Sequence, residues 1–330
     1  MTTPPAIVRD SKASSLVDPT RAMPGPVVAS ALSDSIAAGT GPVSPTLLAP
    51  LPGDVSLLTL GQMYRQRQIA IALAATRAVA SLWARHIDPA RIADSWGTLR
   101  DVVQRLVQQY FSAASADSAS FYGQMRVMSG YPATRVPMVQ LPRKELAKVI
   151  DSQSMGTFFH NIKTVDEHVA AQSAGQSLEA ASGRLALKGG RQTITEAVAQ
   201  DPKAKGWERV IAPGACSFCS MLASRGAVYR SRESAKFLAH DHCHCTPLPL
   251  FVGQAPSQTS KDLAAEWQRV TRGKSGVNAR KAWQDYWEAN NGGRNSGATE
   301  SAQEAGQGNG ERFGGSELSN QAASRIGQPG

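Results

Sequence analysis

All four cysteines of this chain fall in one short window, and this clustering constrains the fold more than any other feature of the sequence. Cys216 and Cys219 are spaced C-x-x-C in PGACSFCSML, and Cys243 and Cys245 are spaced C-x-C in HDHCHC. A C-x-x-C spacing lets two thiolates converge on one ion from a tight turn. If the C-x-C segment is extended, its side chains alternate and both sulfurs point the same way. Two such pairs match a structural, tetrahedral zinc site.

The predicted zinc ligands are therefore the four thiolates, with one variant in which His240 or His242 replaces a cysteine. Such a site would hold together a region that has few large apolar residues. Two other interpretations stay open. The first is a small buried thiol cluster beside ordinary polar loop histidines. The second is a redox C-x-x-C pair, although CSFC lacks the strand-then-helix setting that such motifs usually have.

Catalytic interpretations of the same window lack a complete set of residues. A cysteine nucleophile with a histidine base is possible in principle, but thiolates bound to zinc are not free to attack. His240, Asp241 and His242 would suit a metal that activates water, as in nucleases, but no partner residue for that role is identifiable. The chain also has no Walker loop, no G-x-S-x-G and no H-E-x-x-H motif. No catalytic residue is predicted.

The composition limits the core and the partners. Hydrophobic residues make up 42% of the 330 residues but aromatic residues only 6%, so a sizeable core has to be built mostly from Ala, Val, Leu and Ile. Lys and Arg number 35 against 26 Asp and Glu, which leaves a net charge of +9. This moderate excess is compatible with a nucleic-acid neighbour, with an acidic protein surface or with an ordinary solvated basic surface.

The start of the chain and its most apolar run bear on location. The segment MTTPPAIVRDSKASS lacks the basic start and apolar stretch of a secretory signal. The run from Ile69 to Ile87 carries Arg77 and Arg85 and falls short of a membrane span. We therefore expect synthesis in a cytoplasm and no membrane partner. In that compartment structural disulfides are disfavoured, and clustered cysteines more often bind metal.

Patterning divides the chain into four parts. Residues 1–54 form a Pro/Ala/Ser-rich segment that we expect to be a flexible arm, and residues 290–330 cannot bury enough apolar surface to order. Residues 55–200 have helical periodicity, with helices expected over 56–86, 89–129, 143–150, 155–163 and 165–200. The last of these can break at Gly189 and Gly190. The arginines of the first helix, Arg65 among them, most simply form a solvated face, with a phosphate-contacting stripe as the alternative.

Residues 201–289 differ in character and contain the cysteines. Short strands are expected in GWERVIA, GAVYRS and CTPLPLFVG, and a helix over 260–289. Trp267, Trp283 and Trp287 of that helix are expected in the core rather than on a base-stacking platform. The predicted fold class is mainly α with a small α+β C-terminal module, in which long N-terminal helices precede short strands around a Cys/His cluster.

One family is similar to this region. The segments WERVIAPGACSFCSMLASRGAVYRS and HDHCHCTPLPLF resemble the C-terminal module of Mu gpF-like (MuF) phage head-morphogenesis proteins, in the form found in phages of actinobacteria. The broader family often has HPNCRC where this chain has HDHCHC. The resemblance is specific from about Trp207 to Phe251 and only general over the helices. It falls on Cys216, Cys219, Leu222, Arg225, Gly226, Tyr229, His240, Cys243 and Cys245.

The resemblance implies a minor capsid protein of the virion, packaged in few copies near the portal of the phage head. Its expected partners are the portal protein, capsid or scaffold proteins and, as a further candidate, phage DNA. Its expected role is head assembly or genome packaging and ejection. Related genes are also labelled capsid maturation protease, which is the alternative. A metal-dependent DNA-binding or nuclease module is the second alternative.

Overall fold

The computed structural model describes residues 56–291, except for 213, 230–236, 238 and 240–242. The expected arm at 1–54 and the expected tail, apart from its first two residues, lie outside the described residues. Within these bounds the chain is mostly helical, with a small two-stranded antiparallel sheet near its C-terminal end, which confirms the predicted fold class. No helix among the described residues combines the length and apolar character that a membrane span requires.

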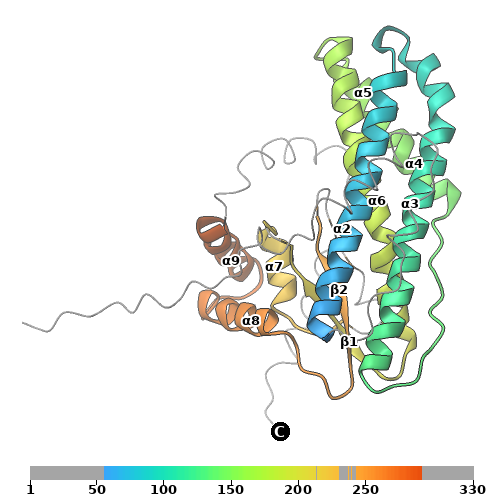
Figure 1. The fold of residues 1–330 in the computed structure, drawn as a ribbon. Coiled ribbons are helices and arrows are strands. Elements are labelled where there is room, and N and C mark those ends of the chain that lie inside the picture. The colour runs from blue at the N-terminus through green and yellow to red at the C-terminus, as the bar shows by residue number, and fades with distance from the viewer. Residues whose placement is uncertain (1–55, 213, 230–236, 238, 240–242, 292–330) are drawn as a thin grey trace, which may run out of the picture.

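Three long helices form the body of the molecule. They are α2 (Leu57–His86), α3 (Ile92–Met128) and α6 (Glu167–Gln200), and they lie side by side (Figure 1). The side chain of Ser56 accepts a hydrogen bond from the Thr59 amide and starts α2, and Asp166 caps α6 in the same way. A shorter rod lies alongside them, made of α4 (Arg143–Asp151), the π-helical η3 (Ser152–Gly156) and α5 (Thr157–Asn161).

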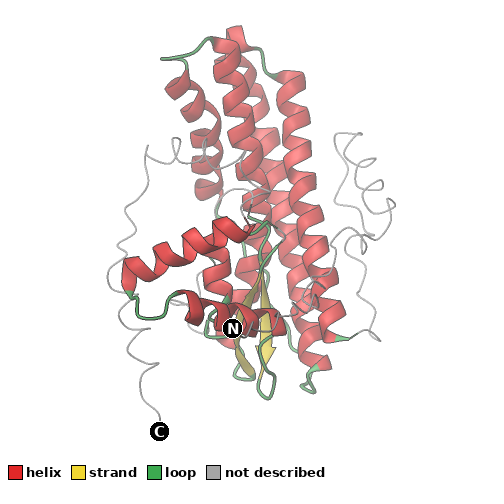
Figure 2. Ribbon diagram, turned by 90° about the vertical axis from the view of Figure 1, so that its left-hand side faces the viewer, coloured by secondary structure: helices red, strands yellow, loops and turns green. Residues whose placement is uncertain are grey.

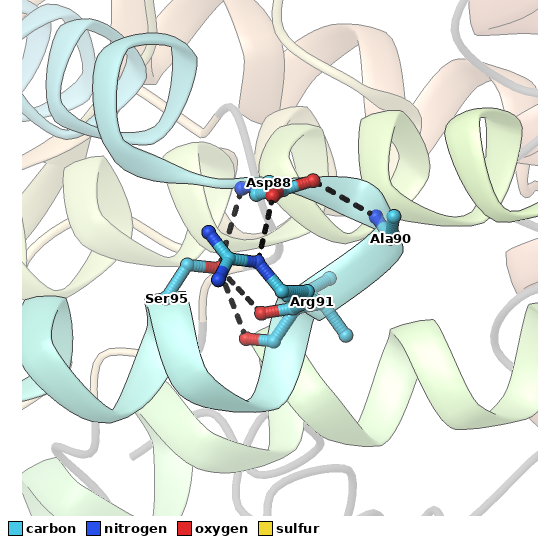
Figure 3. A network of polar contacts seen from close by, with 5 residues as sticks. Asp88, Ala90, Arg91 and Ser95 are labelled. Atoms are coloured by element: carbon cyan, nitrogen blue, oxygen red, sulfur yellow. Dashed lines mark hydrogen bonds and ion pairs between the residues drawn. The ribbon is translucent and has the colours of Figure 1, made fainter.

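The turn between α2 and α3 lies at one end of the bundle, where the sequence predicts a break at Pro89. The short η2 (Pro89–Arg91) occupies this turn. The Asp88 carboxylate accepts hydrogen bonds from the Ala90 amide at 3.1 Å and the Arg91 Nε at 3.2 Å (Figure 3). The Ser95 hydroxyl accepts from the Asp88 amide and donates to the carbonyl of Arg91. The bond from the Ala90 amide satisfies one of the donors that the start of a helix leaves unpaired.

The long helices pack closely because small residues lie between them. A Cβ atom on Gly189 would lie 2.3 Å from the Phe111 carbonyl oxygen of α3, and one on Gly190 would lie 2.1 Å from the Gln68 Oε1 of α2. Helix α6 is continuous through this pair, so the predicted break is wrong. Burial against two neighbouring helices outweighs the poor helix propensity of glycine, which is about 1 kcal/mol per residue.

The C-terminal part adds a small sheet and three helices. Strand β1 (Ala204–Val210) pairs antiparallel with β2 (Thr246–Phe251), and α7 (Ser217–Ala223) follows β1. Of the strand expected in GAVYRS, the structure describes one bridge, between Tyr229 and Trp207. The expected single helix over 260–289 is two helices, α8 (Gln258–Val270) and α9 (Gly276–Asn291). Gly273 and Gly276, at φ +71° and +54°, make the turn between them.

Strand β2 contains two prolines. Pro247 and Pro249 face Arg209 and Trp207 in the ladder. The Trp207 amide donates to the Tyr229 carbonyl, away from β2, so Trp207 and Pro249 form a pair without ladder hydrogen bonds. The proline nitrogens therefore lie on the outer edge, where a missing N–H blocks pairing with another strand.

The sheet and the bundle share one hydrophobic core. Tyr64 of α2 stacks on Phe121 of α3 with ring centroids 4.0 Å apart, and Tyr122 of α3 meets Phe251 of β2 edge-on at 5.5 Å. Trp207 of β1 belongs to the same buried cluster. Seen from the side in Figure 2, the strands lie against one end of the long helices, and two shorter helices run across the bundle axis. The cysteine-bearing segments are thus attached to the helical body.

Candidate metal centre

The β1–β2 ladder brings the two cysteine pairs together. Val210 at the end of β1 pairs with Thr246 at the start of β2. The loop that leaves β1 toward α7 carries Cys216, and the segment that enters β2 carries Cys243 and Cys245. Because antiparallel strands put the end of one beside the start of the other, these segments lie next to each other. The expectation that thiols gather from two segments is met for Cys219, Cys243 and Cys245.

Three sulfurs converge at this point. The Sγ atoms of Cys219, Cys243 and Cys245 all lie within 4.8 Å of one another, and all three side chains are buried. The Cys219 and Cys243 sulfurs are 3.6 Å apart, and the cysteines are free thiols. In a tetrahedral zinc–thiolate site with bonds of about 2.3 Å, neighbouring sulfurs are about 3.8 Å apart. The spacing and the soft donor set therefore fit a zinc ion.

Of the remaining predicted ligands, the structure describes Cys216 but not the histidines. Cys216 is half-buried and caps α7, where its sulfur accepts a hydrogen bond from the Cys219 amide at 3.4 Å. Its thiol also interacts with the Cys219 thiol, although it is outside the three-sulfur group. His240, Asp241 and His242 lie outside the described residues, so their ligand and water-activating roles stay predictions.

The thiols perturb one another strongly. Hydrogen bonds with Cys216, Cys243 and Cys245, together with burial, raise the pKa of Cys219. Hydrogen bonds from Cys219 and Cys245 lower the pKa of Cys243 and outweigh its burial. Cys219 lowers the pKa of Cys245. The opposite effects of Cys243 and of burial are together larger, so the pKa is raised to about 11. The three thiols are therefore strongly coupled to one another, and a bound metal ion would displace their protons.

Arginines from three elements surround the thiols. Arg191 of α6 donates from Nε to the Cys245 carbonyl at 3.0 Å and from Nη2 to the Cys243 carbonyl. Arg209 of β1 donates from Nη1 to the Cys219 sulfur at 3.5 Å. Arg65 of α2 donates to the Ile211 carbonyl at 3.1 Å in the loop that follows β1. The expectation that Arg65 belongs to a solvated face is therefore wrong, because it is half-buried against the centre.

The tryptophans of α9 brace the C-x-x-C segment. Trp283 is 1% exposed and donates from Nε1 to the Ser217 carbonyl at 3.0 Å, and Trp287 donates to the Ala215 carbonyl at 2.8 Å. Trp267 and Trp287 are partly buried against the same core cluster. The core interpretation of these residues is confirmed, and the indole N–H groups of Trp283 and Trp287 add support for the site that the sequence did not predict.

The thiol cluster stands alone as a candidate metal site in the part of the chain that the structure describes, where it is the one group of three or more His, Cys, Asp or Glu side chains close enough to share an ion. A hollow of about 380 Å³ lies at the opposite end of the bundle, lined by Pro89, Ile92 and Phe158 among others. The hollow is lined by no cysteine, so it is separate from the thiol cluster.

A family model described as VG15 protein matches residues 59–270. The match therefore covers the three long helices, the sheet and both cysteine pairs. No curated protein and no solved structure matches the chain.

Proposed function

The chain belongs to the VG15 protein family, which is phage-associated, and from that premise we propose that it is a structural protein of the phage head, of the minor capsid (MuF-like) kind. The observation that carries the proposal is the buried cluster of Cys219, Cys243 and Cys245, which ties α7 to β2. Thiolates that hold a structural ion are neither nucleophiles nor open to a substrate.

Zinc is the ion that we assign to this cluster. Cys219, Cys243 and Cys245 would hold it, with Cys216 or His240 as the fourth ligand. When bound, zinc supplies a cross-link between loops that are distant in sequence, and its binding energy becomes folding energy. The chain's own contribution is to bury the sulfurs and to fix both loops through the sheet and α9.

The remainder of the molecule suits assembly into a larger particle. Its body is an elongated helical bundle, and the sheet with α7, α8 and α9 lies at one end of it. The resemblance of this C-terminal part to MuF modules supports a place near the portal. We propose the portal protein and the capsid or scaffold proteins as partners, and head assembly or genome packaging and ejection as the role. The net charge of +9 is compatible with additional contact to phage DNA.

Co-expression with the portal, capsid and scaffold proteins of the same phage tests this function. Purified heads should contain the chain in a small, fixed ratio to the portal, and mass spectrometry should find the capsid and scaffold proteins uncut. Heads without the chain would contradict the proposal. Cleavage that Asp241→Asn or His240→Ala abolishes would instead support a maturation protease. Degradation of DNA that needs added metal and the same residues would support a nuclease.

A further inference from the structure

The turn between α8 and α9 carries a concentration of positive charge. Residues 267–284 span the end of α8, the turn and the start of α9, and they include no Asp or Glu. Five basic side chains in this stretch are exposed: Arg269, Arg272, Lys274, Arg280 and Lys281. With five basic residues and no acidic one, the stretch has a net charge of +5, more than half of the +9 of the whole chain.

The fold gathers these side chains at one end of the helix pair. Arg269 of α8 lies over the Tyr286 ring of α9, with its Cζ 5.0 Å from the ring centroid. The other four basic residues lie between this contact and the turn, on one helix or the other. Helices α8 and α9 lie to one side of the long helices (Figure 1). The charge is therefore concentrated on a surface that the helical bundle does not cover.

Acidic side chains neutralise only part of this charge. Arg269 pairs with Glu266 at 3.7 Å and Lys281 pairs with Asp285 at 3.1 Å. All four of these side chains are well exposed, and exposed pairs of this kind contribute little. Among the described residues, no ion pair is formed by the other three cations, Arg272, Lys274 and Arg280.

The elements that pack against α8 and α9 do not supply the missing negative charge. Helix α7 packs against both of them, and its sequence, SFCSMLA, has no charged residue. Strand β1 contains Glu208, but its carboxylate accepts a hydrogen bond from the Ser257 amide at 3.0 Å, at the opposite end of α8. Within the described part of the chain, three cations are thus available to an anion from outside.

The other side chains of this surface favour phosphate over an acidic protein. Among residues 267–284, Val277 is the one large apolar side chain that is exposed. A protein interface is centred on buried aromatic or aliphatic anchors, and one valine does not form such a centre. Phosphate contacts use hydroxyl and amide side chains beside Arg and Lys. The exposed residues of these kinds here are Gln268, Ser275, Asn278 and Gln284.

We propose that the α8–α9 turn is a contact surface for the phosphate backbone of double-stranded DNA. The inference rests on the proposed function, because a protein near the portal meets the packaged phage DNA. Contacts to phosphates carry no sequence information, and each one releases counterions from the DNA. Binding should therefore weaken steeply with salt and be independent of base sequence. The surface contains none of the proposed zinc ligands.

Fluorescence anisotropy with short labelled DNA duplexes tests this surface. The full chain should bind two duplexes of unrelated sequence equally well. A triple variant with Arg272→Gln, Lys274→Gln and Arg280→Gln should reduce the slope of log affinity against log salt by about 3, since each phosphate contact contributes about 0.9. At about 0.1 M salt, the same variant should bind at least about 10-fold more weakly. A double variant with Arg272→Lys and Arg280→Lys keeps the charge and should bind like the wild type.

A matched control removes the same charge from the helical body. Arg143, Lys144 and Lys148 are exposed on α4, and replacing all three by Gln also lowers the net charge by three. The affinity and salt slope of this variant should stay close to those of the wild type. Equal weakening in the two triple variants would show that the overall charge attracts DNA, and would overturn the inference.

The remaining outcomes separate this inference from the proposed function. A wild-type chain that binds no duplex, or that binds polyglutamate more tightly than the duplex, would overturn the inference. In the second case the surface would fit an acidic protein. Heads that contain such a chain would leave the proposed function standing. A chain that binds DNA through this surface but is absent from purified heads would contradict the proposed function and leave the DNA contact in place.

Discussion

The indole Nε1 of Trp283 lies 3.0 Å from the carbonyl oxygen of Ser217, and this bond joins α9 to the first turn of α7. The same N–H group is 3.0 Å from the Ser220 hydroxyl. Cys216 and Cys219 flank Ser217 in sequence, so the last described helix supports the segment that presents two of the proposed ligands. The site therefore depends on residues far from it along the chain.

Replacing Trp283 by Phe should weaken this support. A phenyl ring would still occupy most of the site, but the Ser217 carbonyl would lose its donor, which costs about 1–2 kcal/mol of unfolding free energy. Urea unfolding followed by circular dichroism measures the loss. Trp267→Phe is the control, because Trp267 packs against the same core cluster and should cost less. Equal losses in the two variants would show that the hydrogen bond contributes nothing.

Replacing Gly189 by Ala should destabilise the bundle, although alanine is the better helix former. The new Cβ would lie 2.3 Å from the Phe111 carbonyl oxygen, so a backbone has to move, and overpacking of this kind costs about 1–3 kcal/mol. Gly123→Ala in α3 meets nothing within 4 Å and should gain up to about 1 kcal/mol. In thermal unfolding, the midpoint temperature should fall for Gly189→Ala and rise for Gly123→Ala. Stabilisation by Gly189→Ala would contradict the close packing described.

Acid should remove one contribution to stability at the end of α6. Burial disfavours the charge of Asp201, but hydrogen bonds from Arg126, the Lys203 amide and Tyr122 outweigh it and hold its pKa below the ordinary value of 3.8. A depressed folded-state pKa means that this stabilisation is fully present above pH 3.8 and is lost as the pH falls through the lower, folded value.

Asp201→Asn measures that contribution. At pH 7 it should lower the unfolding free energy by about 1.5–3 kcal/mol, the usual worth of hydrogen bonds to a charged group. The difference in unfolding free energy between the variant and the wild type should decrease as the pH is lowered toward 3. Loss of metal in acid affects both proteins, so the difference isolates Asp201. A gap that stays constant with pH would refute the assignment.

Removal of metal should loosen the cysteine-bearing part more than the bundle. Without a shared ion, the loops that carry Cys216 and Cys243 lose their cross-link, while the helix contacts stay in place. A chelator should therefore change the near-ultraviolet dichroism, in which Trp283 contributes, with little change in helical signal. Zinc should restore the original spectrum, and a spectrum that does not respond to chelator would argue against a metal-dependent fold.

The local signals in the sequence were sufficient for most of the helices. Pro89 marks the turn between α2 and α3, and the spacing of apolar residues gives the lengths of the long helices to within a few residues. The predicted helix break at Gly189 and Gly190 was wrong because these residues allow close contact between helices, which only the tertiary structure reveals. The break at Gly273 was missed because the apolar residues on each side of it have helical spacing, as in the i, i+4 pair Trp283 and Trp287.

The candidate site was predictable in its sulfurs and not in its surroundings. Spacing alone pairs Cys216 with Cys219 and Cys243 with Cys245, and three of these sulfurs do meet. Arg191 reaches the site from a helix that ends before the sheet begins. Nothing in the sequence around an arginine in a helix indicates which distant residue it will contact. Such partners become visible only when distant elements pack together.

Native mass spectrometry of the purified full-length chain tests the central claim most directly. The account predicts one zinc ion per chain, and its loss in Cys243→Ser, which removes a buried ligand of the three-sulfur group. A wild-type chain that is folded, free of metal and reactive at all four thiols toward a maleimide would contradict the claim that these cysteines share one ion.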